Sequence, residues 1–184
     1  LGGSMSASSA RKLRRFIEMC DLFNLPIVTF VDQPGFLIGS EGEQTATIRF
    51  GVETLLSAMQ SRVPWASVIV RKSFGVAAGI HLGPGGMTFA WPSAEFGAMP
   101  IEGGVALAYR RELAEAEDPE ARRREIEDEL AMAQSVFPRA EEFGVHELID
   151  PRTTRPALCD WLDSVEPALR ANEGKGAPTY SLRP

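Results

Sequence analysis

A short apolar run followed closely by small residues constrains the fold of this chain more than any other feature. Residues 66–70, Ala-Ser-Val-Ile-Val, are typical of a strand that is buried on both faces. Gly-Val-Ala-Ala-Gly at 75–79 then predicts a tight turn and the start of a short helix. The backbone N–H groups at such a helix start have no intrahelical acceptors, and they suit a developing negative charge. We therefore expect a site for an anionic group at this turn.

The rest of the pattern alternates between helices and strands. Residues 27–31, Ile-Val-Thr-Phe-Val, predict a second buried strand, and short strands are expected at 88–91, 95–98 and 147–149. Apolar spacing and capping residues predict helices at about 10–23, 44–62, 104–113 and 119–136, with a last helix after Thr153 or Thr154. Strands separated by helices imply a parallel sheet, so the predicted fold class is α/β. The expected loop at 32–44 follows the end of a strand, where α/β proteins usually bind ligands.

Helical spacing also predicts which side chains are buried. One face of the helix at 44–62 carries apolar residues that we expect to pack against the core: Ile48, Val52, Leu55, Leu56 and Met59. Both cysteines, Cys20 and Cys159, fall in predicted amphipathic helices. We expect them to be buried reduced thiols rather than a redox-active pair.

The helix at 10–23 has a polar beginning. Ser8 and Ser9 can cap it. Its first turns carry four basic residues: Arg11, Lys12, Arg14 and Arg15. These residues either form a solvated face or contact an anionic ligand, and the sequence leaves both interpretations open.

Composition argues against several classes of function. The chain has 184 residues, which suits one domain, and its net charge of −6 provides no basic surface for nucleic acid. Its two histidines lie far apart and lack metal-ligand spacing, so no metal site is expected. No apolar run approaches the roughly 20 residues of a membrane span and no signal peptide is visible, so we expect a cytoplasmic protein with no membrane partner. Because the chain begins with Leu1, we expect it to be part of a longer or processed protein.

Several short motifs follow one another along residues 2–169. They are Gly-Gly at 2–3, Phe-Asn-Leu-Pro at 23–26, Asp-x-Pro-Gly-Phe-x-x-Gly at 32–39, Arg-Lys-x-Phe-Gly at 71–75, Ala-Trp-Pro-x-Ala-Glu at 90–95, Glu-Gly at 102–103 with Tyr-Arg-Arg-Glu at 109–112, and Ile-Asp-Pro-x-x-Thr-Arg at 149–155. Each motif alone is weak, but their shared order is specific. With them the chain resembles the C-terminal half of the carboxyltransferase subunit of biotin-dependent acyl-CoA carboxylases, such as the propionyl-CoA and acetyl-CoA enzymes.

The resemblance implies a crotonase-like (ClpP/crotonase) α/β fold, a superhelix of strand–strand–helix turns, over residues 1–170. An irregular tail is expected at 171–184. In this family the N-terminal half of the subunit binds the acyl-CoA, and the C-terminal half receives biotin. The implied cofactor is therefore biotin, as carboxybiotin on a carrier. The implied partners are acyl-CoA, the biotin carboxyl carrier protein, biotin carboxylase and the N-terminal carboxyltransferase half, in a homo-oligomer.

The implied reaction moves a carboxyl group from carboxybiotin to the α-carbon of an acyl-CoA. It needs no side-chain nucleophile, which agrees with the lack of a Ser/His/Asp or paired-carboxylate pattern in the sequence. The family stabilises the biotin oxyanion with two consecutive N–H groups, which correspond to Val76 and Ala77. The resemblance implies substrate contacts for six further residues: Gly35, Phe36, Phe74, Gly75, Ala78 and Gly79.

Some of these positions depart from the family pattern. Val76 stands where the family has glycine, and a valine would be strained if that position required a positive φ. Phe74 replaces a frequent tyrosine, and Ala78 with Gly79 replaces a bulkier pair. In the family the residue at Gly79 faces the acyl group and helps to set the chain length that fits. These departures leave the particular acyl-CoA open.

Three alternatives remain open from the sequence. A biotin-dependent acyl-CoA decarboxylase would use the same residues in the opposite direction. A crotonase-type hydratase or hydrolase would need acid/base carboxylates on the glycine-rich helix, and residues 76–82 contain none. A non-catalytic assembly module of the same fold would be favoured by Val76 and Gly79.

Overall fold

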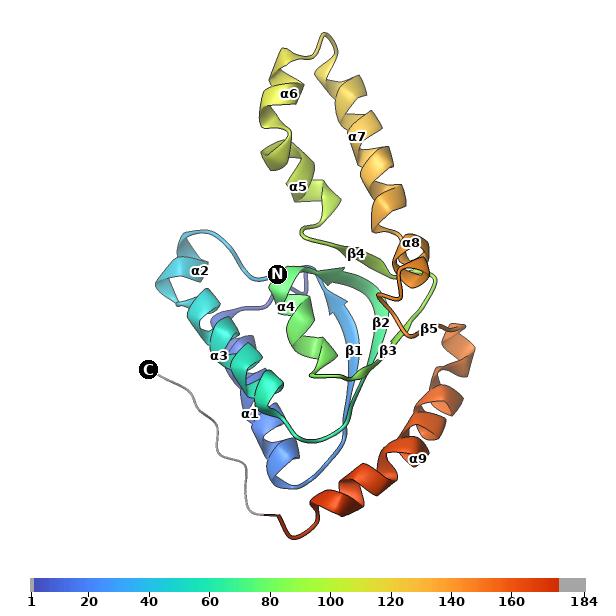
Figure 1. The fold of residues 1–184 in the computed structure, drawn as a ribbon. Coiled ribbons are helices and arrows are strands. Elements are labelled where there is room, and N and C mark those ends of the chain that lie inside the picture. Colours follow the sequence, from blue (N-terminus) through green and yellow to red (C-terminus); the bar gives the residue numbers. More distant parts are fainter. Residues whose placement is uncertain (1, 176–184) are drawn as a thin grey trace.

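The computed structural model describes residues 2–175, apart from the side chains of residues 102, 103 and 107. Its elements follow in the order α1 (Ala7–Leu22), β1 (Ile27–Gln33), α2 (Ser40–Gln44), α3 (Thr47–Gln60), β2 (Trp65–Phe74), α4 (Gly75–Gly79), η1 (Ile80–Leu82), β3 (Met87–Ala90), β4 (Glu95–Gly97), α5 (Ile101–Ala108), α6 (Arg110–Glu115), α7 (Pro119–Gln134), α8 (Val136–Glu141), β5 (Glu147–Leu148), η2 (Pro151–Thr153) and α9 (Thr154–Asn172). Figure 1 shows a body built around the sheet, from which α5, α6 and α7 project as an arm.

The strands of the described residues form one parallel sheet. Its order is β1-β2-β3-β5, and β4 pairs with the last residues of β2. The register aligns Ile27 of β1 with Trp65 of β2, and Ala66 of β2 with Met87 of β3. The predicted parallel α/β architecture is therefore confirmed.

Helices cover both faces of this sheet (Figure 1). One core cluster joins α1, α3 and α4 to the sheet around Ile17 and Trp65. A second cluster lies between the sheet and α9, around Ala66 and Trp161. Because neighbouring strand residues point to opposite faces, Trp65 and Ala66 belong to different clusters.

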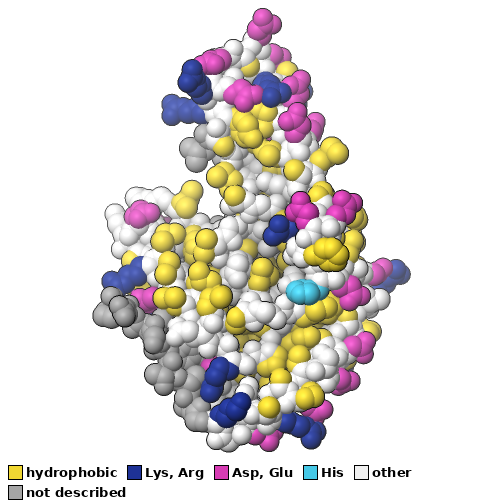
Figure 2. Space-filling view, in the orientation of Figure 1, with side chains coloured by type: hydrophobic (Ala, Val, Ile, Leu, Met, Phe, Trp, Pro, Cys, Tyr) yellow, Lys and Arg dark blue, Asp and Glu magenta, His cyan; other side chains and the backbone are white. Residues whose placement is uncertain are grey.

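The predicted orientation of the helix at 44–62 is wrong. The buried residues of α3 are small or polar: Thr47, Gly51, Thr54, Ser57 and Ala58. The apolar stripe is 42–58% exposed at Ile48, Val52, Leu56 and Met59, and of this stripe only Leu55 packs against the core. Figure 2 shows hydrophobic side chains gathered where α3 forms the surface. The reason is that α1 packs against α3, and small side chains allow two helices to approach closely.

Several element boundaries also differ from the prediction. α1 is capped by Ser6 rather than by Ser8 or Ser9, because the Ser6 hydroxyl accepts the Ser9 N–H at 3.3 Å. The segment 32–44 is not entirely a loop, since β1 extends into its beginning and α2 occupies its end. The helix predicted at 104–113 is two helices, which meet at Tyr109.

The C-terminal part of the chain follows the prediction only in outline. Cys20 is buried, as predicted, whereas Cys159 is exposed on α9. Thr153 is the N-cap residue of α9, but no side-chain hydrogen bond caps this helix. α9 continues to Asn172, so the expected tail at 171–184 begins with helical residues, and 176–184 lie outside the described residues. Within residues 2–175, no helix has both the length and the apolar composition needed to cross a membrane.

Candidate functional site

The turn between β2 and α4 favours a glycine. Gly75 has a φ of +62°, which disfavours any residue with a Cβ. A Cβ at this position would also lie 3.2 Å from the carbonyl oxygen of Ala98. The turn therefore fixes the first residues of α4 at the carboxyl end of β2, the kind of position where α/β proteins bind ligands.

Val76 and Ala77 present backbone N–H groups at the start of α4. They are the second and third residues of the helix, so these N–H groups have no intrahelical acceptor. Among residues 2–175, neither N–H group donates to a backbone oxygen outside the helix. Val76 is not among the non-glycine residues with a positive φ in the described chain, so valine is unstrained here. The departure from glycine at this position leaves the donor in place.

A cavity of about 400 Å³ lies between α4, β4 and α8. One wall is the face of α4 that carries Gly75, Ala78 and Gly79, which the helical spacing places side by side. A Cβ at Gly79 would meet no atom within 4 Å, so this wall leaves space for a ligand. The remaining lining residues are Ser73, Leu82, Phe96, Gly97, Ala133, Pro138, Arg139, Glu142 and Gly144.

The structure separates the predicted substrate-binding residues into two groups. Gly75, Ala78 and Gly79 line the cavity. Gly35 and Phe36 belong to the loop after β1 and do not line it. Gly35 accepts the Met5 N–H at 2.9 Å, and the Phe36 ring packs so closely on α3 that a Cβ at Gly51 would lie 2.4 Å from it.

Phe74 lies buried beside the cavity. Its side chain is only 1% exposed. Its ring packs against β4, where a Cβ at Gly97 would lie 3.0 Å from it. Phe74 therefore packs behind Gly97, one of the residues that line the cavity, and is not itself a lining residue.

Sequence analysis did not identify three polar residues of the cavity: Ser73, Arg139 and Glu142. Ser73 occupies the variable position of the Arg-Lys-x-Phe-Gly motif, so the motif carries no information about it. Arg139 and Glu142 lie in a stretch without a motif. No spacing signal connects these positions, because β4 and α8 bring them together only in the fold.

Hydrogen bonds to one carbonyl group fix the end of the α4–η1 segment. The carbonyl oxygen of His81 accepts from the hydroxyl groups of Thr29 on β1 and Ser67 on β2, each at 2.8 Å. Burial lowers the pKa of the His81 imidazole below its ordinary value of 6.5, because the charged form loses hydration. Among the described residues, no group of three or more His, Cys, Asp or Glu side chains is placed to bind a metal ion.

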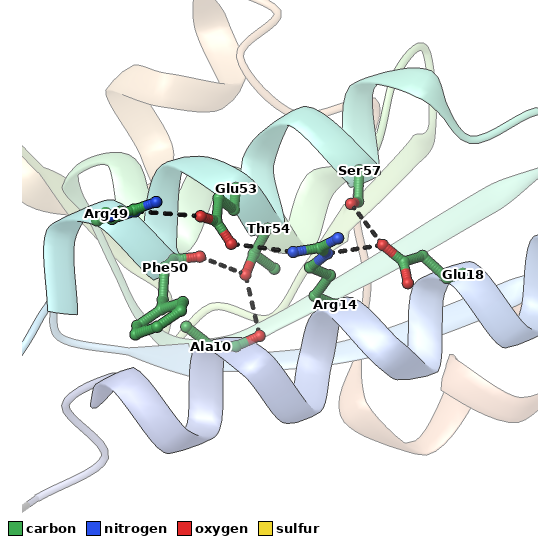
Figure 3. Close-up of polar contacts among 8 residues, drawn as sticks. All are labelled: Ala10, Arg14, Glu18, Arg49, Phe50, Glu53, Thr54 and Ser57. Carbon is green, nitrogen blue, oxygen red and sulfur yellow. Dashed lines mark hydrogen bonds and ion pairs between the residues drawn. The ribbon is translucent and has the colours of Figure 1, made fainter. Parts of the chain in front are cut away.

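A polar network joins the helix pair α1–α3 (Figure 3). Arg14 on α1 donates to Glu18 at 2.7 Å and to Glu53 on α3 at 2.9 Å. The Ser57 hydroxyl donates to Glu18 at 3.1 Å. The Thr54 hydroxyl lies 2.9 Å from the Ala10 carbonyl oxygen. Arg14 is therefore paired with carboxylates of the fold itself. The sequence had suggested only a solvated face or contact with an anionic ligand for this basic segment.

A parallel α/β sheet with a strand that ends at free N–H donors is typical of proteins that bind an oxyanion or a substrate at the strand ends. The carboxyl transferase domain family matches residues 1–172 of this sequence. The chain belongs to this family.

Known relatives match over most of this chain. It is 40% identical over 161 residues to the carboxyltransferase subunit of propionyl-CoA carboxylase from Haloferax mediterranei, covering 85% of this chain and 31% of the relative. It is 36% identical over 165 residues to the mitochondrial propionyl-CoA carboxylase beta chain of Homo sapiens, covering 88% of this chain and 29% of that protein. The chain therefore spans about a third of the length of these relatives.

A solved structure confirms the fold. Transcarboxylase 12S, a hexamer solved with methylmalonyl-coenzyme A and methylmalonic acid bound, is 30% identical and superposes with a TM-score of 0.81. The match covers 98% of this chain and 35% of that one. The crotonase-like α/β fold that the motifs implied is therefore the fold of this chain.

Proposed function

We propose that this chain is the biotin-facing part of a carboxyltransferase that moves a carboxyl group from carboxybiotin to the α-carbon of an acyl-CoA. The observation that carries the proposal is the pair of unpaired N–H groups at Val76 and Ala77, next to the cavity. Membership of the carboxyl transferase domain family supports it, as do relatives named for propionyl-CoA carboxylase. A valine without backbone strain at position 76 supports an intact donor pair over a degenerate assembly module.

The residues of this chain fit a ureido group. Two N–H groups at the start of α4 can donate to one oxygen, and they are held by a turn that favours glycine. Biotin would supply a nitrogen that carries the carboxyl group and an oxygen on which negative charge develops. The contribution of Val76 and Ala77 would be to stabilise that oxygen without moving, because the fold already orients both donors.

We further propose that other protein surfaces cover the apolar parts of this domain, in a complex with biotin carboxylase, the biotin carrier and the acyl-CoA-binding half. The exposed stripe of α3 is one such surface. The second is a groove of about 630 Å³ between β1 and α9, where Val28 and Phe30 face Leu158 and Leu162. Exposed apolar patches of this kind favour association. Light scattering of the complete subunit should show an oligomer at micromolar concentration, and a stable monomer would contradict this part of the proposal.

Removing one donor tests the proposed reaction. Ala77→Pro and Val76→Pro each delete one N–H group within the first turn of α4, where proline is best tolerated. Each should lower kcat of the assembled enzyme by about 100- to 1000-fold, the usual loss for one oxyanion donor.

A matched control is Ser8→Pro, which removes the N–H group at the corresponding second position of α1. It should leave kcat unchanged. Circular dichroism shows whether each variant is folded. A folded Ala77→Pro enzyme with normal kcat would disprove the assignment of the donors.

A further inference from the structure

Arg139 has unused hydrogen-bonding capacity on the wall of the cavity. It lies on α8, which Figure 1 shows at the foot of the arm, beside β4. Its side chain is 52% exposed, and its guanidinium group donates no hydrogen bond to an acceptor in residues 2–175. Its nearest carboxylate oxygen belongs to Glu142, 3.9 Å from Nη1, and this distance is too long for a hydrogen bond.

The position of the Arg139 side chain is nevertheless constrained. It lies across the backbone of Gly144, where a Cβ would come within 2.3 Å of Nε and 2.5 Å of Cδ. The Gly144 N–H group also donates to the Arg139 carbonyl oxygen at 2.8 Å, which fixes the end of α8. A guanidinium group whose stem is held in place loses less conformational entropy when a ligand binds.

Ser73 presents a second unused group to the same cavity. It is the penultimate residue of β2 and is only 7% exposed. Its hydroxyl group makes no hydrogen bond to another described residue and is not among their fully buried side-chain atoms, so it stays accessible from the cavity. Among the residues that line the cavity, the only charged ones are Arg139 and Glu142.

We propose that Ser73 and Arg139 form a carboxylate-binding site in this cavity, opposite the wall formed by Gly75, Ala78 and Gly79. The planar guanidinium group would donate two parallel hydrogen bonds to the carboxylate, and the Ser73 hydroxyl group would donate a third. Glu142 carries the same charge as the ligand and lies close to Arg139, so it weakens binding at this site.

The carboxylate can come from two sources. It is either the carboxyl group in transit, on its way to the α-carbon, or a carboxylate at the far end of the acyl chain. This identity rests on the proposed function, whereas the existence of the site does not. Both sources share the same chemistry, a carboxylate that meets a guanidinium group and a hydroxyl group.

Anion binding by the protein itself tests the site. Malonate and glutarate are titrated into the purified chain, or into the complex that contains it if the chain alone is not folded, and the melting temperature is recorded. Chloride at equal ionic strength provides the baseline. Malonate or glutarate should raise the melting temperature saturably, because a ligand that binds only the folded state stabilises it.

Four variants of the cavity residues should change the affinity for a dicarboxylate in stated directions. Arg139→Gln should weaken dicarboxylate binding by about 10- to 100-fold and Ser73→Ala by about 5- to 10-fold, because each removes donors to a charged group. Arg139→Lys should recover part of the loss. Glu142→Gln should tighten binding about 2- to 5-fold. The control Arg124→Gln, on the exposed face of α7, should leave binding unchanged.

Kinetics of the assembled enzyme distinguish the two sources. If the bound group is the carboxyl group in transit, Arg139→Gln should lower kcat for every acyl-CoA to the same degree. If it is the end of the acyl chain, the variant should lower kcat/KM only for acyl-CoA substrates that end in a carboxylate.

Two results would overturn the site: no saturable stabilisation by either dicarboxylate, or equal stabilisation of the wild type and a folded Arg139→Gln variant. Failure of the proposed function has a different signature. In that case the assembled complex would transfer no carboxyl group, while malonate or glutarate would still bind in an Arg139-dependent manner.

Discussion

Two arginines of this domain are in opposite situations. In the helix pair α1–α3, Arg14 donates to two carboxylates, at 2.7 and 2.9 Å. In the cavity between α4 and α8, Arg139 donates to no acceptor of the described residues, and its nearest carboxylate is 3.9 Å away. The hydroxyl groups differ in the same way, since Thr54 is bonded to the Ala10 and Phe50 carbonyl oxygens whereas Ser73 is not bonded.

The difference separates scaffold from site. Buried polar groups in a folded protein are normally paired, because an unpaired one loses the hydrogen bonds that water provided. In the polar network between α1 and α3 this rule is obeyed, so those groups contribute to the stability of the fold. The fully buried side-chain atoms without a partner among the described residues, Ser61 Oγ and Trp65 Nε1, lie outside both this network and the cavity. Around the cavity, the Ser73 hydroxyl group, the half-exposed Arg139 guanidinium group and the N–H groups of Val76 and Ala77 have no hydrogen-bond acceptor among the described residues. A ligand can accept hydrogen bonds from them.

The largest effect that we expect from this contrast is on stability. Arg14→Met should lower the free energy of unfolding by about 2 kcal/mol, because it leaves Glu18 partly buried without a cation and leaves Glu53 with only the exposed Arg49, at 3.4 Å. The matched change Arg139→Met should alter it by less than about 0.5 kcal/mol. Urea unfolding followed by circular dichroism measures both. Equal losses would show that Arg139 belongs to the scaffold.

The next effect concerns the size of the acyl group and tests the opposite wall of the cavity. Gly79→Ile should shift kcat/KM toward acetyl- or propionyl-CoA and away from longer chains by about tenfold, close to 1.4 kcal/mol, because the new side chain fills space that is now open. The control is the unfolding free energy, which should not fall, since a Cβ there meets no atom. An unchanged ratio of rates with long and short acyl-CoA would show that Gly79 does not face the acyl group.

A smaller difference should separate the two hydroxyl groups. Thr54→Val keeps the shape of the side chain but removes a buried hydrogen bond, which should lower the free energy of unfolding by about 1 kcal/mol. Ser73→Ala should change it by no more than about 0.5 kcal/mol, because no bond within the described chain is lost. Denaturation midpoints at constant m-value provide the comparison. A larger loss in Ser73→Ala than in Thr54→Val would reverse our assignment of the two regions.

The smallest expected effect is a pH dependence from His81. Its pKa is lowered in the folded state, so above about pH 6.5 the imidazole is neutral in both states and this contribution to stability is complete. Below pH 6.5 the unfolded chain takes up a proton first, and stability is lost as the pH falls toward the lowered folded value. His81→Gln should reduce the difference in unfolding free energy between pH 7.5 and pH 5.5.

Asp150 also makes stability depend on pH, but in a more acidic range than His81. Hydrogen bonds from Arg152 lower the pKa of its carboxyl group below 3.8, so its contribution is lost only at more acidic pH. A wild-type protein with the same stability at pH 7.5 and pH 5.5 would contradict the role of His81.

Much of the fold could be predicted from the sequence because its signals are local. The continuous run at 66–70 requires a strand buried on both faces, and it became the centre of β2. Asp118 followed by Pro119 predicted the start of α7, and the structure shows the Asp118 carboxylate accepting the N–H groups of Glu120 and Ala121. The tight turn at Gly75 was predicted for the same reason, because the lack of a Cβ is a property of the residue itself.

The orientation of α3 could not be predicted in this way. Periodicity identifies an apolar stripe but does not show whether the core or another surface covers it. Here α1 packs on the opposite face, where Gly51 and Ala58 are small and the hydroxyl groups of Thr54 and Ser57 find partners across the helix pair. The stripe at Ile48 and Val52 was left exposed as a result.

The sequence by itself determined the helix and strand order, the glycine turn and the family motifs, because each of these depends on residues that are close together in the chain. Only the tertiary structure decided the composition of the cavity. Ser73 at the end of β2 and Arg139 on α8 are far apart in sequence, and the pairing of β4 with β2 places α8 beside α4. Whether a polar side chain is paired or free depends on what the rest of the fold brings within about 3 Å of it, and no local pattern of residues records that distance.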